Sequence, residues 1–213
     1  MSKTYRSIAV LVLVLVGLVG CDYEPEAARE TNSVRVAEMK QTFRDLWLGH
    51  IYWVQHVVLN HETSSLAERD AAEKEVVANA KQIATTVIPF YGEARSEMLF
   101  ALLVGHVAAI KEYSQATILG DTRNQDAALV HLASNADEIA EFFNGVNPHH
   151  LPKDTVRGLI AAHGAHHVLQ INQYKRKEYA HLTESWPMMR QHVYVIADTL
   201  TTAFVRQFPS QFS

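Results

Sequence analysis

Cysteine is almost absent from this sequence, because its 213 residues include only one, Cys21. A single cysteine excludes an intramolecular disulfide and any metal site built from several thiolates. A metal ion would therefore have to be held by histidine, carboxylate or methionine side chains. Histidine is well represented, with 12 residues.

Basic clusters, phosphate-binding loops and membrane-length apolar runs are missing as well. Lys and Arg number 19 against 23 Asp and Glu, so the formal charge is −4. A weakly acidic chain without a basic cluster is a poor partner for nucleic acid. No glycine-rich phosphate loop or G-x-S-x-G element is present. The apolar stretch 8–18 is well short of the roughly 20 residues that a spanning helix needs.

The first twenty residues have the composition of a cleaved export signal. Lys3 and Arg6 precede the apolar stretch, as in the positive segment and apolar core of a signal peptide. The stretch ends Leu18-Val19-Gly20-Cys21, which resembles the lipobox of bacterial lipoproteins. This resemblance implies cleavage before Cys21, acylation of the cysteine and anchoring in a membrane through its acyl chains.

The same resemblance divides the chain into three parts. Residues 1–20 are expected to be the signal peptide, 21–33 a polar lipidated tether, and 34–213 a helical domain that faces the periplasm. Asp22 resembles the inner-membrane retention signal of enteric bacteria and favours the inner membrane. The alternatives are an ordinary signal peptide that ends near a cysteine, or a short membrane anchor. A membrane is thus an expected partner, whereas the sequence identifies no protein partner.

Residues 34–213 carry apolar side chains at helical spacing, and strand patterns are weak. In the first predicted helix, Phe43, Trp47, Ile51 and Val54 fall on one face. This periodicity predicts an all-α domain. Turn signals between the periodic segments divide it into six helices, over 34–60, 66–88, 93–119, 125–144, 153–182 and 184–207.

An internal repeat is the most informative feature of this predicted domain. Its copies are offset by 56 and 57 residues, and Leu48-Gly49-His50-Ile51 matches Val104-Gly105-His106-Val107. The sequence therefore predicts a six-helix bundle built from three repeated helical hairpins, about 34–90, 91–147 and 148–209. In every copy a histidine is followed 29 residues later by a second polar residue: His50 by Asn79, His106 by Asn135, and His163 by His192.

Each predicted hairpin points two polar side chains towards its apolar core. The residues three and four positions before each histidine are apolar, and the residue four positions after each second-helix polar residue is isoleucine. A buried polar group without a partner costs about 1–3 kcal/mol. The six groups therefore have to bind one another, water or a ligand.

Three interpretations of these groups remain open. In the first, the histidines only pair with Asn79 and Asn135, and the pairs clasp the hairpins of a structural or interaction protein. In the second, neutral imidazoles bind a divalent transition metal such as zinc, copper or nickel, or a small ligand. In the third, metal-bound water makes the protein a hydrolase, with Asp137, Glu138 and Asp198 as candidate bases. Whether the protein is an enzyme is therefore left open.

The third hairpin holds the most candidate metal ligands. His163 and His167 are one helical turn apart and could share an ion, while His192 replaces the asparagine of the other copies. The segment His163-x-x-His166-His167-x-x-Gln170 resembles the motif of the DinB/YfiT-like metal-binding helical bundles.

That resemblance implies a divalent metal held by His163, His167 and one earlier histidine, His50 or His106. The glycine that usually precedes the glutamine in that family is Leu169 here. Residues 46–55 and 88–106 also resemble small helical proteins of bacteria. The predicted metal ligands are His163, His167, His192, His50 and His106.

Overall fold

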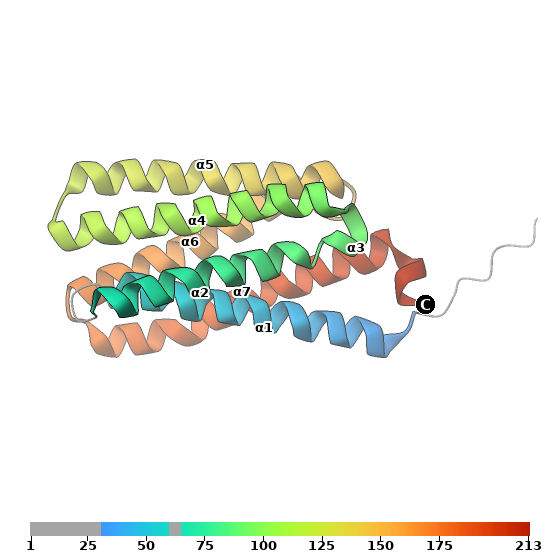
Figure 1. Ribbon diagram of the computed structural model, residues 1–213, viewed down its shortest axis with the longest axis horizontal. Helices are drawn as coiled ribbons and strands as arrows, with labels where there is room; N and C mark the ends of the chain where they lie inside the picture. The colour runs from blue at the N-terminus through green and yellow to red at the C-terminus, as the bar shows by residue number, and fades with distance from the viewer. Residues whose placement is uncertain (1–30, 60–64) are drawn as a thin grey trace, which may run out of the picture.

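The computed structural model describes residues 31–59 and 65–213 (Figure 1). Within these ranges the chain is all-helical, as predicted, and forms no strand. The predicted signal peptide, Cys21 and most of the tether lie outside the described residues. None of the described helices combines the length and apolar character needed to cross a membrane. The helices are α1 (Ser33–Leu59), α2 (Leu66–Thr85), α3 (Ile88–Tyr91), α4 (Glu93–Leu119), α5 (Thr122–Val146), α6 (Lys153–Lys175) and α7 (Tyr179–Gln207), followed by the 3₁₀ turn η1 (Pro209–Phe212).

The described residues therefore form seven α-helices rather than the predicted six. The second predicted helix ends early, at Thr85, and the short α3 follows with Pro89 in its first turn. The fifth predicted helix also ends early, at Lys175, because Lys177 adopts a left-handed backbone with φ of 59°. Helix α7 begins at Tyr179, five residues before the predicted start at residue 184. Pro187 therefore lies in its interior and not near its first turn.

Local sequence signals explain several helix ends. Ser65 and Glu68 form a reciprocal capping box at the start of α2. Gly120 ends α4 in a left-handed conformation that a residue with a side chain rarely adopts, with φ of 70°. Asp121 then caps α5 by accepting a hydrogen bond from the backbone N–H of Asn124.

The long helices form an elongated bundle in which α1, α4 and α6 contact one another (Figure 1). Each remaining long helix packs against two of these three: α2 against α1 and α4, α5 against α4 and α6, and α7 against α6 and α1. Contacts between α1 and α7 thus join the first and last long helices of the chain. Side chains from α1, α4 and α6 can consequently meet at the centre of the bundle.

The buried apolar side chains form two separate clusters along the bundle. One cluster contains Trp47, Leu103 and Ile160, and the other contains Val54 and Ile110. On α1, His50 lies in the sequence between Trp47 of the first cluster and Val54 of the second. The inward histidines therefore lie where the two apolar clusters meet.

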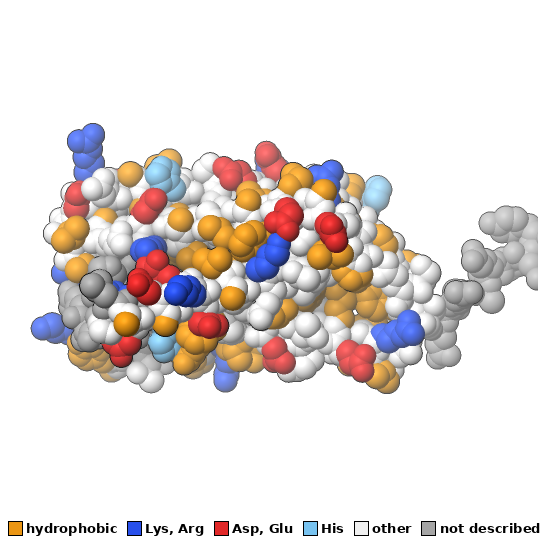
Figure 2. Space-filling model, in the orientation of Figure 1, with side chains coloured by type: hydrophobic (Ala, Val, Ile, Leu, Met, Phe, Trp, Pro, Cys, Tyr) orange, Lys and Arg blue, Asp and Glu red, His pale blue; other side chains and the backbone are white. Residues whose placement is uncertain are grey.

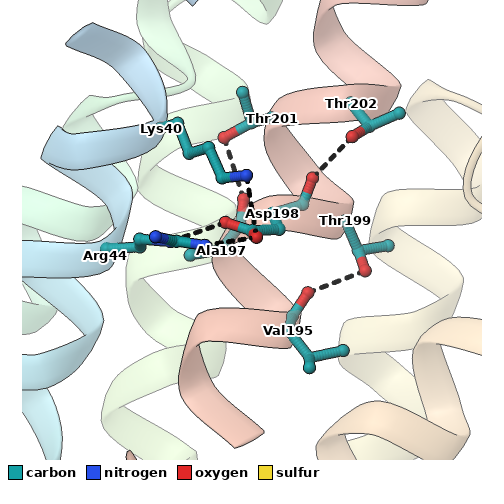
Figure 3. A network of polar contacts seen from close by, with 8 residues as sticks. All are labelled: Lys40, Arg44, Val195, Ala197, Asp198, Thr199, Thr201 and Thr202. Atoms are coloured by element: carbon teal, nitrogen blue, oxygen red, sulfur yellow. Dashed lines mark hydrogen bonds and ion pairs between the residues drawn. The ribbon is translucent and has the colours of Figure 1, made fainter. Parts of the chain in front are cut away.

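An ion-pair network joins α1 to α7 (Figure 3). The carboxylate of Asp198 accepts two hydrogen bonds from the Arg44 guanidinium, at 2.8 and 2.6 Å, and lies 3.0 Å from Lys40 Nζ. Partial burial opposes the charge of Asp198, but the bonds from Arg44 and Lys40 outweigh it and lower the pKa of this carboxyl group. The network therefore helps to hold α1 and α7, the first and last long helices, together.

Asp198→Asn is expected to lower the free energy of unfolding at neutral pH by about 1–2 kcal/mol, because a two-pronged charged contact is lost. Since the folded pKa is lowered, this contribution is present above the unfolded pKa and disappears as the pH falls through the folded pKa. Urea unfolding measures the difference. Asp154→Asn is the matched control, because the Asp154 side chain is 94 % exposed and its ion pair with Arg157 is long at 4.0 Å. A loss of stability of equal size in this control would contradict the prediction.

Candidate metal centre

Three histidines converge from the three helices that contact one another: His50 of α1, His106 of α4 and His163 of α6. Each offers a ring nitrogen, and these nitrogens all lie within 4.8 Å of one another. The three side chains are 0–2 % exposed, and their ring centroids are 5.4 to 6.3 Å apart. This trio, His50, His106 and His163, lies close enough to bind a metal ion.

His167 lies beside the trio, one turn after His163 on α6. Its Nε2 atom is 3.3 Å from His163 Nε2, and its side chain is 2 % exposed. Zinc–nitrogen bonds of about 2.0–2.1 Å in tetrahedral geometry separate two ligand nitrogens by about 3.3–3.4 Å. The hydrogen bond between His163 Nε2 and His167 Nε2 has this same length, so an ion held by both nitrogens would take the place of the shared proton. The trio nitrogens lie within 4.8 Å of one another.

The same hydrogen bond is made by Asn79 of α2, Asn135 of α5 and His192 of α7. Each donates a hydrogen bond to the backbone carbonyl four residues before the histidine of the preceding helix. His192 uses its Nε2–H for this bond, so only its Nδ1 lone pair is left for a ligand. The pairs are Asn79 with Leu46 (3.0 Å), Asn135 with Leu102 (2.9 Å) and His192 with Leu159 (2.8 Å).

Two glycines allow the asparagines to come this close. A Cβ atom at Gly49 would lie 3.2 Å from Asn79 Nδ2, and one at Gly105 would lie 3.4 Å from Asn135 Nδ2. The third predicted repeat has Ala162 at the corresponding position, directly before His163. The imidazole of His192 is longer than an asparagine amide and can reach the carbonyl across this extra methyl group.

Asn135 also fixes the protonation of His106. Its Oδ1 atom lies 3.0 Å from His106 Nδ1, and an amide oxygen can only accept, so His106 Nδ1 carries the proton. His106 Nε2 keeps its lone pair and has no hydrogen-bond partner among the described residues. Burial and His106 lower the pKa of His50, and Asn79 opposes this shift only in part. Neither ring nitrogen of His50 has a partner with hydrogen-bond geometry among the described residues.

Unpartnered polar atoms concentrate around the trio. Of the eight such buried side-chain atoms found in the described part of the chain, four belong to His50, His106 and His163. A fifth is Trp47 Nε1, whose ring meets those of His50 and His163 edge-on at 5.8 and 5.9 Å. Such atoms are rare in folded proteins and call for an explanation such as a bound ion.

The buried histidines are neutral at physiological pH. Burial lowers the pKa of His50 to about 3, with a further contribution from His106, and burial lowers that of His106 to about 4. The pKa values of His163 and His167 are also far below the ordinary value, first through burial and then through neighbouring imidazoles. Neutral imidazole is the form that binds metals.

The remaining predicted ligand, His192, lies at the edge of this group. It is half-buried, and its ring stacks on that of His163 at 6.3 Å. His166 lies 5.2 Å from His192, and partial burial together with His192 lowers the pKa of His166. The trio is buried, so the histidines seen in pale blue in the space-filling view of Figure 2 are other, exposed ones.

The carboxylates considered for hydrolysis have other partners. Asp198 is bound by Arg44 and Lys40, Asp137 lies 3.6 Å from Arg157, and Glu138 accepts a hydrogen bond from the Ser134 hydroxyl at 3.2 Å. In the described part of the chain, the trio is the one group of ligand side chains close enough to hold an ion, and it contains no carboxylate.

No family model, curated protein or solved structure matches this chain. The resemblances to the lipobox and to DinB/YfiT-like bundles stay predictions.

Proposed function

We propose that this protein is a membrane-anchored, extracytoplasmic lipoprotein that binds one divalent transition metal ion, such as zinc, copper or nickel, at the centre of its bundle. The observation that carries the proposal is the convergence of His50, His106 and His163, from three different helices, with their ring nitrogens within 4.8 Å. His167 is the natural fourth ligand, since its Nε2 is 3.3 Å from His163 Nε2.

The donor set decides which ions are suitable. Imidazole nitrogen prefers zinc, copper, nickel and iron, whereas magnesium and calcium require oxygen ligands. His50, His106 and His163 are buried away from solvent and no carboxylate belongs to their group, which suits holding an ion better than activating water. Binding, storage or transfer of the ion is therefore a better fit than hydrolysis.

We further propose that the domain is a bundle of three repeated hairpins, α1–α2, α4–α5 and α6–α7, and that the repeat creates the site. The shared hydrogen bond of Asn79, Asn135 and His192 to equivalent carbonyls supports this reading. In such an arrangement the first helix of each hairpin brings one equivalent histidine to a common axis.

The proposed anchor rests on the N-terminal sequence. An acylated Cys21 and a polar tether would hold the bundle at a membrane surface, with Asp22 favouring the inner membrane. Incorporation of labelled palmitate, and its loss in Cys21→Ser, tests the anchor independently of the metal.

The metal test uses the full-length protein, purified without metal and titrated with Zn²⁺ by calorimetry. One ion per chain is expected to bind, and zinc at about 100 times its Kd should stabilise the fold by about 2.7 kcal/mol. A melting temperature that does not respond to zinc, copper or nickel would contradict the proposal.

A purely structural role is the second candidate, favoured by the His106–Asn135 hydrogen bond. On that interpretation, the pairs between first and second helices hold each hairpin together and no ion is needed. It would predict a satisfied imidazole in each hairpin, whereas both ring nitrogens of His50 lack partners in the described structure.

A further inference from the structure

Two more imidazoles lie between the buried trio and the solvent. His166 of α6 and His192 of α7 are half-buried, and their ring centroids are 5.2 Å apart. The ring of His192 is parallel to that of His163 within 11°, at 6.3 Å. Imidazoles therefore lead without interruption from the partly exposed α6–α7 surface to the buried trio.

The other two repeats have no such row. The hairpin contact itself needs no histidine at these positions, because Asn79 and Asn135 make it in the other copies. The additional imidazoles are therefore a property of the third copy and not of the hairpin. At the positions equivalent to His166, His167 and His192, the first copy has Trp53, Val54 and Asn79, and the second has Ala109, Ile110 and Asn135.

We propose that His166 and His192 form an outer metal-binding pair that accepts an ion from solvent and passes it to His163 and His167. This inference rests on the proposed metal centre and describes how that centre is loaded. Both outer residues have a nitrogen to offer: His192 donates only through Nε2, which leaves Nδ1, and His166 makes no hydrogen bond to any described residue.

The physical reason for an outer pair is the cost of removing water from an ion. Moving a charged species from water into a buried site in one step is unfavourable by several kcal/mol even after relaxation. A half-exposed pair can replace part of the hydration shell while water still fills the remaining positions. His163 is then close enough to compete for the ion before the rest of the shell is lost.

The test measures loading and equilibrium separately, with Co²⁺ as the probe. A cobalt ion held by four imidazoles gives a strong visible absorption band, whereas one held by two imidazoles and several waters gives a weak band. Stopped-flow absorbance on the full-length protein therefore follows arrival at the buried centre. The test variant is His166→Gln with His192→Gln, since glutamine can still donate to the Leu159 carbonyl from its amide nitrogen. The control is His131→Gln with His181→Gln, which removes two exposed histidines elsewhere.

The test variant is expected to load about tenfold or more slowly, with the final band intact and the Kd changed by less than about threefold. The control should load at the wild-type rate. Loading of the test variant at the wild-type rate would overturn the outer pair while leaving the buried centre in place. Absence of the strong band in the wild-type protein would instead overturn the centre, and the loading route with it. His166→Gln alone, at a half-exposed position, should show a smaller slowing in the same direction.

Discussion

Replacing His50 with leucine is expected to weaken zinc binding by about 100-fold or more and to make the metal-free protein more stable. Both ring nitrogens of His50 are buried without a hydrogen-bond partner in the described structure, so the side chain costs free energy unless a ligand uses it. Leucine has a similar size, suits the surrounding Trp47 and Val54, and removes that cost. A gain of about 1–2 kcal/mol in the unfolding free energy is expected, measured in urea with a chelator present.

His106→Leu is the matched comparison. It should weaken zinc binding to a similar degree, because it also removes one member of the trio. In the metal-free protein it should have the opposite effect, a loss of about 1–3 kcal/mol, because Asn135 Oδ1 loses the N–H of His106. Equal destabilisation by both variants, with zinc binding unchanged, would support the purely structural interpretation and sink the metal centre.

Lowering the pH from about 7 to about 5 is expected to remove about 4 kcal/mol from the stability of the metal-free protein through His50 and His106 alone. The folded pKa values of His50, His106, His163 and His167 are all lowered, so the unfolded chain binds protons that the folded protein cannot. With an unfolded pKa of about 6.5 and folded pKa values of about 3 and about 4, His50 and His106 each cost about 2 kcal/mol at pH 5. His163 and His167 act in the same direction. The stability is fully present above the unfolded pKa and is lost as the pH falls from there towards the folded values.

Since whole domains are stable by about 5–15 kcal/mol, this loss should unfold the metal-free protein cooperatively between about pH 6 and 4.5. Near-UV circular dichroism during an acid titration would follow the transition. Bound zinc should move the midpoint to lower pH, because protons compete with the ion for the same nitrogens. His50→Leu should also unfold at lower pH, since it removes one proton from the transition. Native packing that persists at about pH 4 without metal would contradict the lowered pKa values.

The sequence was sufficient to predict an all-α chain and to select His50, His106 and His163 as inward-facing residues, but it predicted six helices where the described residues form seven. Spacing alone places His50, His106 and His163 inward, because one face of a helix repeats every three to four residues. The boundary between α6 and α7 was not predictable in this way, since periodicity continues across Lys177 and only its left-handed backbone ends the helix.

The different positions of His167 and His192 also needed the structure. Both were predicted as ligands, yet His167 lies beside the trio while His192 is half-buried and donates to Leu159. Periodicity gives a direction from the helix axis but not a depth, and the depth here depends on how α7 packs against α6. The sequence signal that could have set His192 apart is Ala162, which stands where the other two predicted repeats have glycine, beside the asparagine amide.

The division of the apolar core into two clusters has a consequence for cooperativity. Apolar contacts bind each cluster internally, but at the level of His50 they are interrupted by imidazoles, four of whose ring nitrogens have no hydrogen-bond partner in the described structure. Without metal, the half of the bundle around Val54 and Ile110 should open independently of the half around Trp47 and Leu103, as a separate unit in hydrogen exchange. An ion shared by α1, α4 and α6 would make both halves open together. Binding of an ion at the centre would then slow hydrogen exchange at the far ends of these helices, well away from the ion itself.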